Sequence, residues 1–531
     1  MSVALSPAHL RSIPDIAKVD HWYMAALFSF FCALFTFYFC INNRKPEKYF
    51  SELSSKTAYR FCGLKPYGEE IPNKLKQCSL VHVNALFRHG TRTPNAKSIV
   101  GFADVYNRLK RSYENGSPIP REFIEHPIPF EGSAVKELLP TGYEEHDGLG
   151  RRFRDRMIKY FNLTDENVRF YSSSIDRSIA SGRAFYNGLI DGPPVKPIWN
   201  RKLYCGDAEV PDSCILDEPT DDNTIHHKNI KINDDLLRFF AKCKSYIEKI
   251  EKNKTASVEY YQFLKSEYVN TSYENFLQRY NLNREDYTSD DVRTIFLACS
   301  YEIAAMSDFG DSISPWCKLL TPSDIPVWEY SADLKHYWLK SYGYELNYIQ
   351  SCPLLGEMLT QITQAVKQFA SGGFDQSDVS VHRGSFWFGH AETVLPVVAA
   401  LGIFNESVGH STVHRLTADN FDERLSMLQQ DPPPPTMFRT GYITPFAGNI
   451  AFMVYYCPDS EESTNEWDKF RVEVLVNEKT VAWPLASRVQ PPTLEAPGDT
   501  NAPLSTVLKH FTGCMPDVYD HDAVCSLKKN P

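Results

Sequence analysis

The chain has 531 residues, of which 43% are hydrophobic and 23% charged, and its formal net charge at pH 7 is -10. This length and hydrophobic content suffice for two compact units and argue against intrinsic disorder. The acidic balance argues against a nucleic-acid partner, because proteins that bind the phosphate backbone present a basic face. A site for a phosphate group in this protein must therefore be a local basic pocket.

Residues 22–41 carry no charge and are about long enough to cross a bilayer as one helix. They are too long and too aromatic for a typical signal peptide, and no small-x-small cleavage site follows them. A buried core helix is the alternative interpretation. We expect a short tail at 1–21, an uncleaved transmembrane signal anchor at 22–41, and a stem at 42–74.

The flanking residues give conflicting indications of how this span is oriented. Lys and Arg are at least as frequent after it as before it, which alone would leave the large domain in the cytosol. Eleven of the 13 cysteines follow the span, which favours an oxidising compartment. Five Asn-x-Ser/Thr sites also follow it, at Asn115, Asn162, Asn253, Asn270 and Asn405. Because large domains translocate largely regardless of flanking charge, we expect a lumenal or extracellular domain.

Three units of strand, loop and helix are predicted after the stem. Residues 80–87 form an apolar strand candidate before the helical pattern of 98–111. The same order recurs from 168 to 189 and from 385 to 400. Ligands of open α/β sheets collect at the carboxyl ends of strands. The residues delivered to those ends are Arg88, His89, Arg92, Arg177, His390 and Glu392.

The remaining segments complete an α/β organisation. We expect a sheet core flanked by helices at 75–194 and 376–490, with two further strands at 449–457 and 470–476. Between them, 195–375 reads as an inserted, mainly helical cap, since its long charged and aromatic segments lack strand alternation. The Pro, Thr and Ala content beyond 490 predicts a loose C-terminal tail at 491–531, pinned by Cys514 or Cys525.

The run Arg-His-Gly-Thr-Arg-Thr-Pro at residues 88–94 has the composition of a phosphate-handling loop. A guanidinium group can donate two parallel hydrogen bonds to two phosphoryl oxygens, and it stays charged. An imidazole nitrogen can accept a phosphoryl group. A solvated basic turn is the alternative, and a metal site is a second one. The arginines would repel a cation and no His/Asp/Glu cluster has ligand spacing, so we expect no metal.

This run resembles the RHGxRxP signature of the histidine acid phosphatases. The downstream run Phe-Gly-His-Ala-Glu at 388–392 places its acid one position later than the His-Asp of most members, and is similar to the branch of multiple inositol polyphosphate phosphatases. Further stretches that resemble this branch are 237–240, 314–317, 333–347 and 439–447. The resemblance covers roughly residues 75 to 490.

The resemblance implies a histidine-phosphatase fold and a role for each site residue. His89 is the expected nucleophile, which becomes transiently phosphorylated, and Glu392 the expected proton donor. Arg88, Arg92, Arg177 and His390 are expected to hold the phosphate. Without the resemblance, Arg177 would read as a surface arginine and Glu392 as a first-turn glutamate that stabilises a helix.

The implied substrates are inositol hexakisphosphate and lower inositol polyphosphates, with 2,3-bisphosphoglycerate as a second possibility, and no cofactor is required. Four residues are candidates for substrate specificity: Lys97, Lys335, His336 and Lys340. Two alternatives stay open. One is a secretory-pathway acid phosphatase for a phosphorylated sugar or general phosphomonoesters, and the other is a catalytically silent, membrane-tethered binding protein.

Overall fold

The computed structural model describes residues 51–61, 75, 77–190, 192, 230–306, 313–372, 380–405, 415–430, 434, 437–458, 466–482, 484–485 and 500–527. All of them belong to one unit, Tyr49–Pro531. The predicted anchor at 22–41 lies outside these ranges. Within them, no helix combines the length and the apolar character needed to cross a bilayer.

A mixed sheet forms the centre of this unit, in the order β3-β2-β4-β1-β5-β6-β7, with β8 also pairing β6. The strands are β1 (Ser79–Arg88), β2 (Val168–Ser172), β3 (Ile230–Ile232), β4 (Gly384–Gly389), β5 (Asn449–Tyr456), β6 (Phe470–Val476), β7 (Lys479–Thr480) and β8 (Asn501–Pro503). The first four run parallel to one another, and β5 is antiparallel to both β1 and β6. The predicted strands of the core are confirmed.

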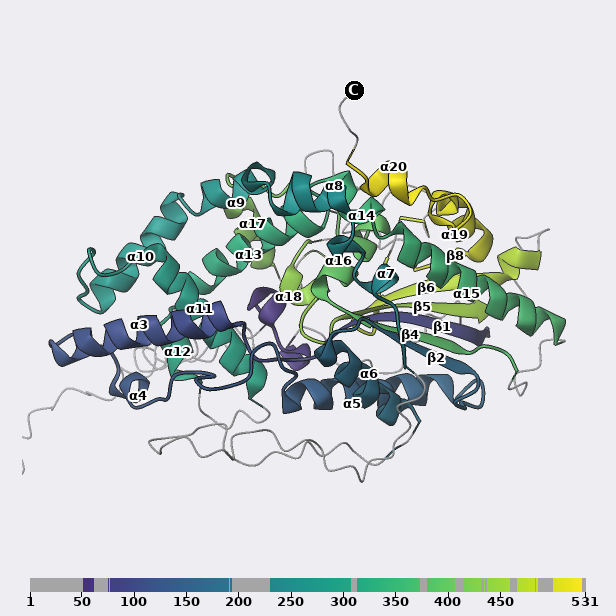
Figure 1. Ribbon diagram of the computed structural model, residues 1–531, viewed down its shortest axis with the longest axis horizontal. Helices are drawn as coiled ribbons and strands as arrows, with labels where there is room; N and C mark the ends of the chain where they lie inside the picture. Colours follow the sequence, from purple (N-terminus) through teal and green to yellow (C-terminus); the bar gives the residue numbers. More distant parts are fainter. Residues whose placement is uncertain are drawn as a thin grey trace, which may run out of the picture. The chain divides into compact units, whose positions relative to one another are not determined.

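Helices cover both faces of the sheet (Figure 1). α5 (Pro140–Met157) and α6 (Asp176–Leu189) cover one face, where the rings of Phe87, Phe185 and Phe388 lie 4.7 to 5.5 Å apart. α15 (Cys352–Ser371) and α16 (Ala391–Ala400) cover the other face. Because β1 and β4 are buried on both faces, their sequences do not alternate between apolar and polar residues. Between the strand ends, the polar side chains His82, Asn84 and Ser385 are buried and hydrogen-bonded.

A helical layer lies beyond the carboxyl ends of β1 and β4 (Figure 1). It contains α10 (Glu267–Arg279), α11 (Ser289–Ala305), α12 (Pro315–Lys318) and α13 (Asp324–Lys340). The shorter helices of the chain are α4 (Arg121–Ile124), α7 (Asp234–Leu237), α8 (Lys244–Tyr246), α9 (Val258–Phe263), α14 (Glu345–Ile349), α17 (Phe421–Leu428), α18 (Thr440–Ile443), α19 (Leu504–His510) and α20 (His521–Cys525). α3 (Ala96–Glu114) packs against α11 of this layer rather than on the sheet.

The structure differs from the predicted organisation in three places. Residues 51–61, assigned to a stem, form two 3₁₀ turns, η1 (Ser54–Lys56) and η2 (Tyr59–Phe61), that pack on the folded unit. The segment assigned to the cap also supplies β3 to the sheet and α15 to its face. The segment assigned to a loose tail contributes β8 and α19, because its apolar residues Ala502, Leu504 and Val507 are buried.

Four disulfides tie distant segments together: Cys78–Cys457, Cys243–Cys525, Cys299–Cys317 and Cys352–Cys514. Two of them hold the C-terminal segment, as the sequence predicted for Cys514 and Cys525. Three other cysteines that follow residue 41, Cys62, Cys205 and Cys214, lie outside the described ranges. Cross-links between segments this far apart stabilise the fold chiefly by restricting the unfolded chain.

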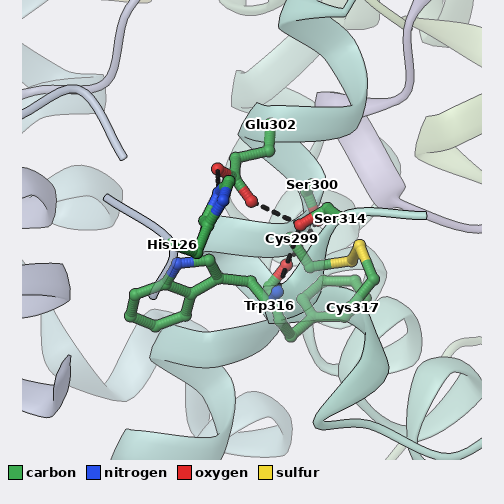
Figure 2. Close-up of a disulfide and its surroundings, with 8 residues drawn as sticks. His126, Cys299, Ser300, Glu302, Ser314, Trp316 and Cys317 are labelled. Atoms are coloured by element: carbon green, nitrogen blue, oxygen red, sulfur yellow. Dashed lines mark hydrogen bonds and ion pairs between the residues drawn. A yellow bond between two sulfur atoms is a disulfide. The ribbon is translucent and has the colours of Figure 1, made fainter. Parts of the chain in front are cut away.

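The third disulfide fastens α12 to α11, as Figure 2 shows. Beside it, the Ser314 hydroxyl donates to the Glu302 carboxylate and accepts from the Trp316 backbone N–H. The other Glu302 oxygen lies 2.6 Å from His126 Nε2. These contacts account for a buried carboxylate in α11 and fix the start of α12, so the helical layer is rigidly joined at this point.

Two buried carboxyl groups on α13 make stability depend on pH. Burial raises the pKa of Asp333, which accepts from the Thr440 N–H and hydroxyl, to about 7. Burial also raises the pKa of Glu329, 3.4 Å from Arg439 Nη2, to about 7. Between about pH 4 and about pH 7 the folded state thus binds more protons than the unfolded state. The stability that these protonated carboxyl groups contribute is fully present near pH 4 and is lost as pH rises through about 7.

We expect the Asp333→Asn variant to lose less stability than the wild type between pH 5 and pH 7.5. An amide keeps the oxygen that accepts from Thr440 but does not ionise, so the Tm of the variant minus that of the wild type should increase by roughly 1–3 °C from pH 5 to pH 7.5. Calorimetry or thermal denaturation at both pH values checks this. A constant gap would contradict it.

Candidate active site

The loop after β1 is held by backbone contacts from three neighbouring segments. The His89 N–H donates to the Gly389 carbonyl at 3.0 Å, and the His89 carbonyl accepts from Ala447 at 3.1 Å. From α5, His146 Nε2–H donates to the Arg88 carbonyl at 3.1 Å. Burial lowers the pKa of His146 to about 3, so the imidazole that makes this hydrogen bond is uncharged. The loop is therefore fixed before any ligand arrives.

Two glycines allow α5 to approach the loop this closely. A Cβ added at Gly90 would lie 2.5 Å from the Gly142 carbonyl oxygen, and one added at Gly142 would lie 2.3 Å from the Thr91 carbonyl oxygen. Both contacts are with backbone, which cannot move aside without displacing the loop. The glycine in the motif is thus required by contact with α5, since backbone meets backbone here.

His89 is buried and holds one defined tautomer. Its Nδ1 lies 2.9 Å from the Gly90 carbonyl oxygen, which can only accept, so Nδ1 carries the hydrogen and Nε2 carries the lone pair. Burial lowers the pKa of His89 well below its usual range, and the nearby Arg88, Arg177 and Arg92 lower it further. The ring is therefore neutral and nucleophilic at Nε2 even in mild acid.

Three arginines surround this ring. Arg88 Nη1 donates to the Ser55 and Thr444 carbonyls at 2.5 and 2.8 Å, and its guanidinium lies 4.5 Å from the Phe446 ring centroid. Arg92 Nη1 donates to the Thr93 carbonyl at 2.6 Å. The Nε atoms of Arg88, Arg92 and Arg177 are buried and have no hydrogen-bond partner among the described residues. Unsatisfied cationic donors that converge on one place favour an anionic ligand.

Repulsion within this group lowers some pKa values but leaves the charge in place. Burial and then Arg92 lower the pKa of Arg88 to about 10 and that of Arg177 to about 10. Both guanidinium groups therefore stay charged at neutral and acidic pH. The mutual repulsion of these buried guanidinium groups destabilises the unliganded site, and a bound phosphate dianion would offset it through attraction to all of them.

His390 lies beside His89 at the start of α16, with 5.6 Å between the ring centroids. Its Nδ1 lies 3.4 Å from Arg177 Nη2 and its Nε2 lies 3.1 Å from the Ser173 hydroxyl. Burial lowers the pKa of His390 to about 3, and Arg177 and Arg238 add to this against the effect of Glu392. The neutral ring occupies a helix N-terminus, where partial positive charge favours anions.

Glu392, in the first turn of α16, forms an ion pair with the last residue of α13. Lys340 Nζ lies 2.5 Å from Glu392 Oε1. Burial by itself raises the pKa of Glu392, but the charge and hydrogen bond of Lys340 outweigh it and lower the pKa well below its usual range. Glu392 is thus a carboxylate in the unliganded protein.

The other predicted specificity residues differ in their exposure and in their interactions with this ion pair. His336 Nδ1–H donates to the Ala332 carbonyl at 2.7 Å, and the ring interacts electrostatically with Lys340 and Glu392. Lys335 is exposed, with Nζ 5.5 Å from the Tyr260 ring centroid, and it repels both Lys340 and Lys97. Lys97 is exposed at the start of α3.

Sequence reasoning missed three residues at this site. Lys56 in η1 repels Arg88, Arg92 and Lys340, and burial together with these charges lowers its pKa well below its usual range. Tyr301 in α11 lies under Arg92, with the guanidinium 5.9 Å from the ring centroid. Arg238 repels Arg177 and lowers the pKa of His390, which favours the neutral ring. Only Arg238 had a signal, since it falls in the stretch 237–240 noted above.

The sequence profile of the histidine phosphatase superfamily (branch 2) matches residues 79–477, so the chain belongs to this superfamily. It is similar to multiple inositol polyphosphate phosphatase 1 of Gallus gallus, with 30% identity over 402 residues that cover 76% of this chain and 77% of the relative. It is also similar to the Homo sapiens protein of that name, with 27% identity over 420 residues, 77% of this chain and 76% of the relative. The resemblance drawn from the motifs is confirmed.

Solved structures show the same fold. The multiple inositol polyphosphate phosphatase of Bifidobacterium longum in complex with inositol hexasulfate superposes with a TM-score of 0.60 at 16% identity, covering 88% of this chain and 98% of that one. The phytase from D. castellii gives a TM-score of 0.59 at 16% identity, with coverage of 91% and 88%. At this identity the likeness concerns the fold, and it confirms the predicted histidine-phosphatase architecture.

Proposed function

We propose that this protein is a phosphomonoesterase that hydrolyses inositol hexakisphosphate and lower inositol polyphosphates through a phosphohistidine intermediate. The observation that carries this proposal is the free Nε2 lone pair of a neutral His89 among converging arginines. The similarity to proteins named multiple inositol polyphosphate phosphatase and phytase supports the substrate class. A silent binding protein would not need a nucleophile held in one tautomer.

In the first step His89 Nε2 attacks phosphorus. The N–P bond forms while the bond from phosphorus to the inositol oxygen breaks, and Glu392, once protonated, gives its proton to that oxygen. Arg88, Arg92 and Arg177 stabilise the charge on the phosphoryl oxygens, with help from His390 and the start of α16.

In the second step water attacks the phosphohistidine. Glu392, now a carboxylate, accepts a proton from the water as the N–P bond breaks, so inorganic phosphate leaves and His89 returns to its neutral form. Every proton in the cycle is carried by a side chain of this chain or by water. No metal or organic cofactor takes part.

Cations beyond the three arginines fit the remaining phosphates of a polyphosphate. Lys56 interacts electrostatically with Arg88, Arg92 and Lys340, and Lys335 on α13 interacts with Lys340 and with Lys97 on α3. An inositol ring presents phosphates on adjacent carbons, so several ammonium groups can bind more than one phosphate at once. Since the chain as a whole is acidic, this local concentration of lysine serves a particular ligand.

We further propose that residues 22–41 anchor the protein in a membrane with the catalytic unit in the secretory-pathway lumen or outside the cell. Four disulfides support an oxidising compartment. Of the five glycosylation sequons, Asn115, Asn162, Asn253 and Asn270 are exposed, which supports a glycoprotein. Glycosidase sensitivity and protease protection in sealed microsomes would test this placement.

Phosphate release by the full-length protein tests the proposed activity. We expect release from inositol hexakisphosphate at acidic to neutral pH, with kcat/KM at least about tenfold higher than for a sugar monophosphate, because the lysines bind only the former. Hydrolysis of the sugar phosphate alone would overturn the substrate class. No release from either substrate would overturn the enzymatic function.

A further inference from the structure

The ion pair between Glu392 and Lys340 joins two elements that come together only in the fold. The residues are 52 positions apart, on α16 and α13, and their nearest charged atoms lie 2.5 Å apart. The side chains are 36% and 23% exposed, so a ligand can reach the pair. This separates it from a buried structural salt bridge such as Arg439–Glu329, in which the carboxylate is 2% exposed.

The surroundings of Glu392 hold many positive charges and few negative ones. The titratable and charged groups that face it are Lys340 and His336 from α13, His390 from its own helix start, Lys56 from η1, Arg88 from β1, Arg177 from α6 and Tyr246 from α8. No other carboxylate is among these groups of the described structure. The field therefore favours the carboxylate form, with Lys340 as its closest contributor.

This arrangement conflicts with the proposed first step, which requires a protonated Glu392. Every substrate brings a phosphate dianion to the arginines. Its negative charge lies near the carboxyl group of Glu392 and favours protonation of that group. With an isolated phosphate, however, Lys340 keeps its carboxylate partner. A second phosphate on the adjacent carbon offers Lys340 a dianionic partner, which competes with the singly charged Glu392 carboxylate for the ammonium and weakens its effect on that carboxylate.

We propose that Lys340 is a positioning residue that holds Glu392 ionised until a neighbouring phosphate of the substrate draws the ammonium away, so that the proton donor forms only with polyphosphates. This inference rests on the proposed function and deepens it. Lys340 then has two effects: it strengthens the binding of a polyphosphate and slows the first step for an alkyl monophosphate. Specificity arises in the chemical step as well as in binding.

The test is the pH dependence of the first step, measured as release of the inositol product in single turnovers at saturating enzyme. The substrates are inositol hexakisphosphate, myo-inositol monophosphate, which has an alkyl leaving group and no second phosphate, and p-nitrophenyl phosphate, whose leaving group needs no proton. Unmodified protein should show the alkaline fall in rate at least about one pH unit higher with the hexakisphosphate than with the monophosphate.

Lys340→Met should speed the first step with the monophosphate and weaken the binding of the hexakisphosphate. The alkaline fall for the monophosphate should move up to that of the hexakisphosphate, so its first step at neutral pH should be about 3–10-fold faster. The KM for the hexakisphosphate should rise about tenfold, since a charge-assisted contact is lost. The rate with p-nitrophenyl phosphate should show no such shift.

Lys318→Met is a matched control, because Lys318 pairs with Glu122 at 2.7 Å between two other helices and should leave all three profiles unchanged. Coincident alkaline limbs for the two inositol substrates in the unmodified protein would overturn the inference, and this comparison needs no variant. Slower turnover of both substrates by Lys340→Met would also overturn it. If the hexakisphosphate is not hydrolysed at all, the proposed function fails and the inference fails with it.

Discussion

Replacing His89 with alanine is expected to reduce turnover of every phosphomonoester by at least about 10³-fold, because the variant lacks the imidazole nitrogen proposed to accept the phosphoryl group. His390 does not substitute for it, since its ring nitrogens lie near Arg177 and Ser173. The arginines remain in the variant, so binding of inorganic phosphate should survive. Loss of turnover with retained phosphate binding would identify His89 as the nucleophile rather than as a structural residue.

Rapid acid or alkaline quenching with a radiolabelled substrate checks the intermediate directly. A phosphohistidine is labile in acid and stable in base, so label should remain on the unmodified protein only after alkaline quenching. His521→Ala, which removes an exposed histidine of α20, is the matched control and should still incorporate label. Incorporation by His89→Ala equal to that of this control would exclude the proposed mechanism.

Replacing Glu392 with glutamine is expected to slow the first step with inositol phosphates by about 10²–10⁴-fold, because an amide cannot protonate the departing alkoxide. With p-nitrophenyl phosphate the first step should stay near the normal rate. The second step also uses Glu392, as base, so this variant should release about one equivalent of p-nitrophenol in a burst and then turn over slowly.

Rapid-mixing measurement of p-nitrophenol, with quenched-flow measurement of inositol products, distinguishes the two roles of Glu392. A burst with the aryl substrate and none with the inositol substrate supports acid catalysis followed by base catalysis. Equal slowing of the first step with both substrates would show that Glu392 acts in some other way, for example by placing Lys340. The distance of 2.5 Å between Lys340 Nζ and Glu392 Oε1 is the reason to test this alternative role.

Local sequence signals predicted the parts of the site that are attached to strand ends. β1, β2 and β4 are short apolar runs followed by polar residues, and parallel strands deliver such residues to one edge. The structure brings Arg88, His89 and His390 together at this edge, where the sequence analysis expected them. Periodicity and loop position carry this information, and no long-range contact had to be known.

Long-range packing produced what the sequence did not predict. Lys56 precedes β1 by more than twenty residues, and tertiary contacts of η1, among them that of Ser55 with Arg88, bring it to the site. The pairing of Lys340 with Glu392 depends on how α13 crosses α16, which no repeat in either helix encodes. α3 has a regular helical pattern, but its sequence does not reveal that its apolar side faces α11.

The packing of η1 beneath Arg88 has a consequence for where the chain can be cut. Ser55 supplies a carbonyl to the first arginine, Thr57 supplies another to Phe446, and the Ser54 hydroxyl contacts Thr440. The segment that precedes β1 thus forms part of the phosphate site. A protein shortened to begin at Ser51 would keep these contacts, whereas one that starts at β1 would lack one wall of its phosphate site.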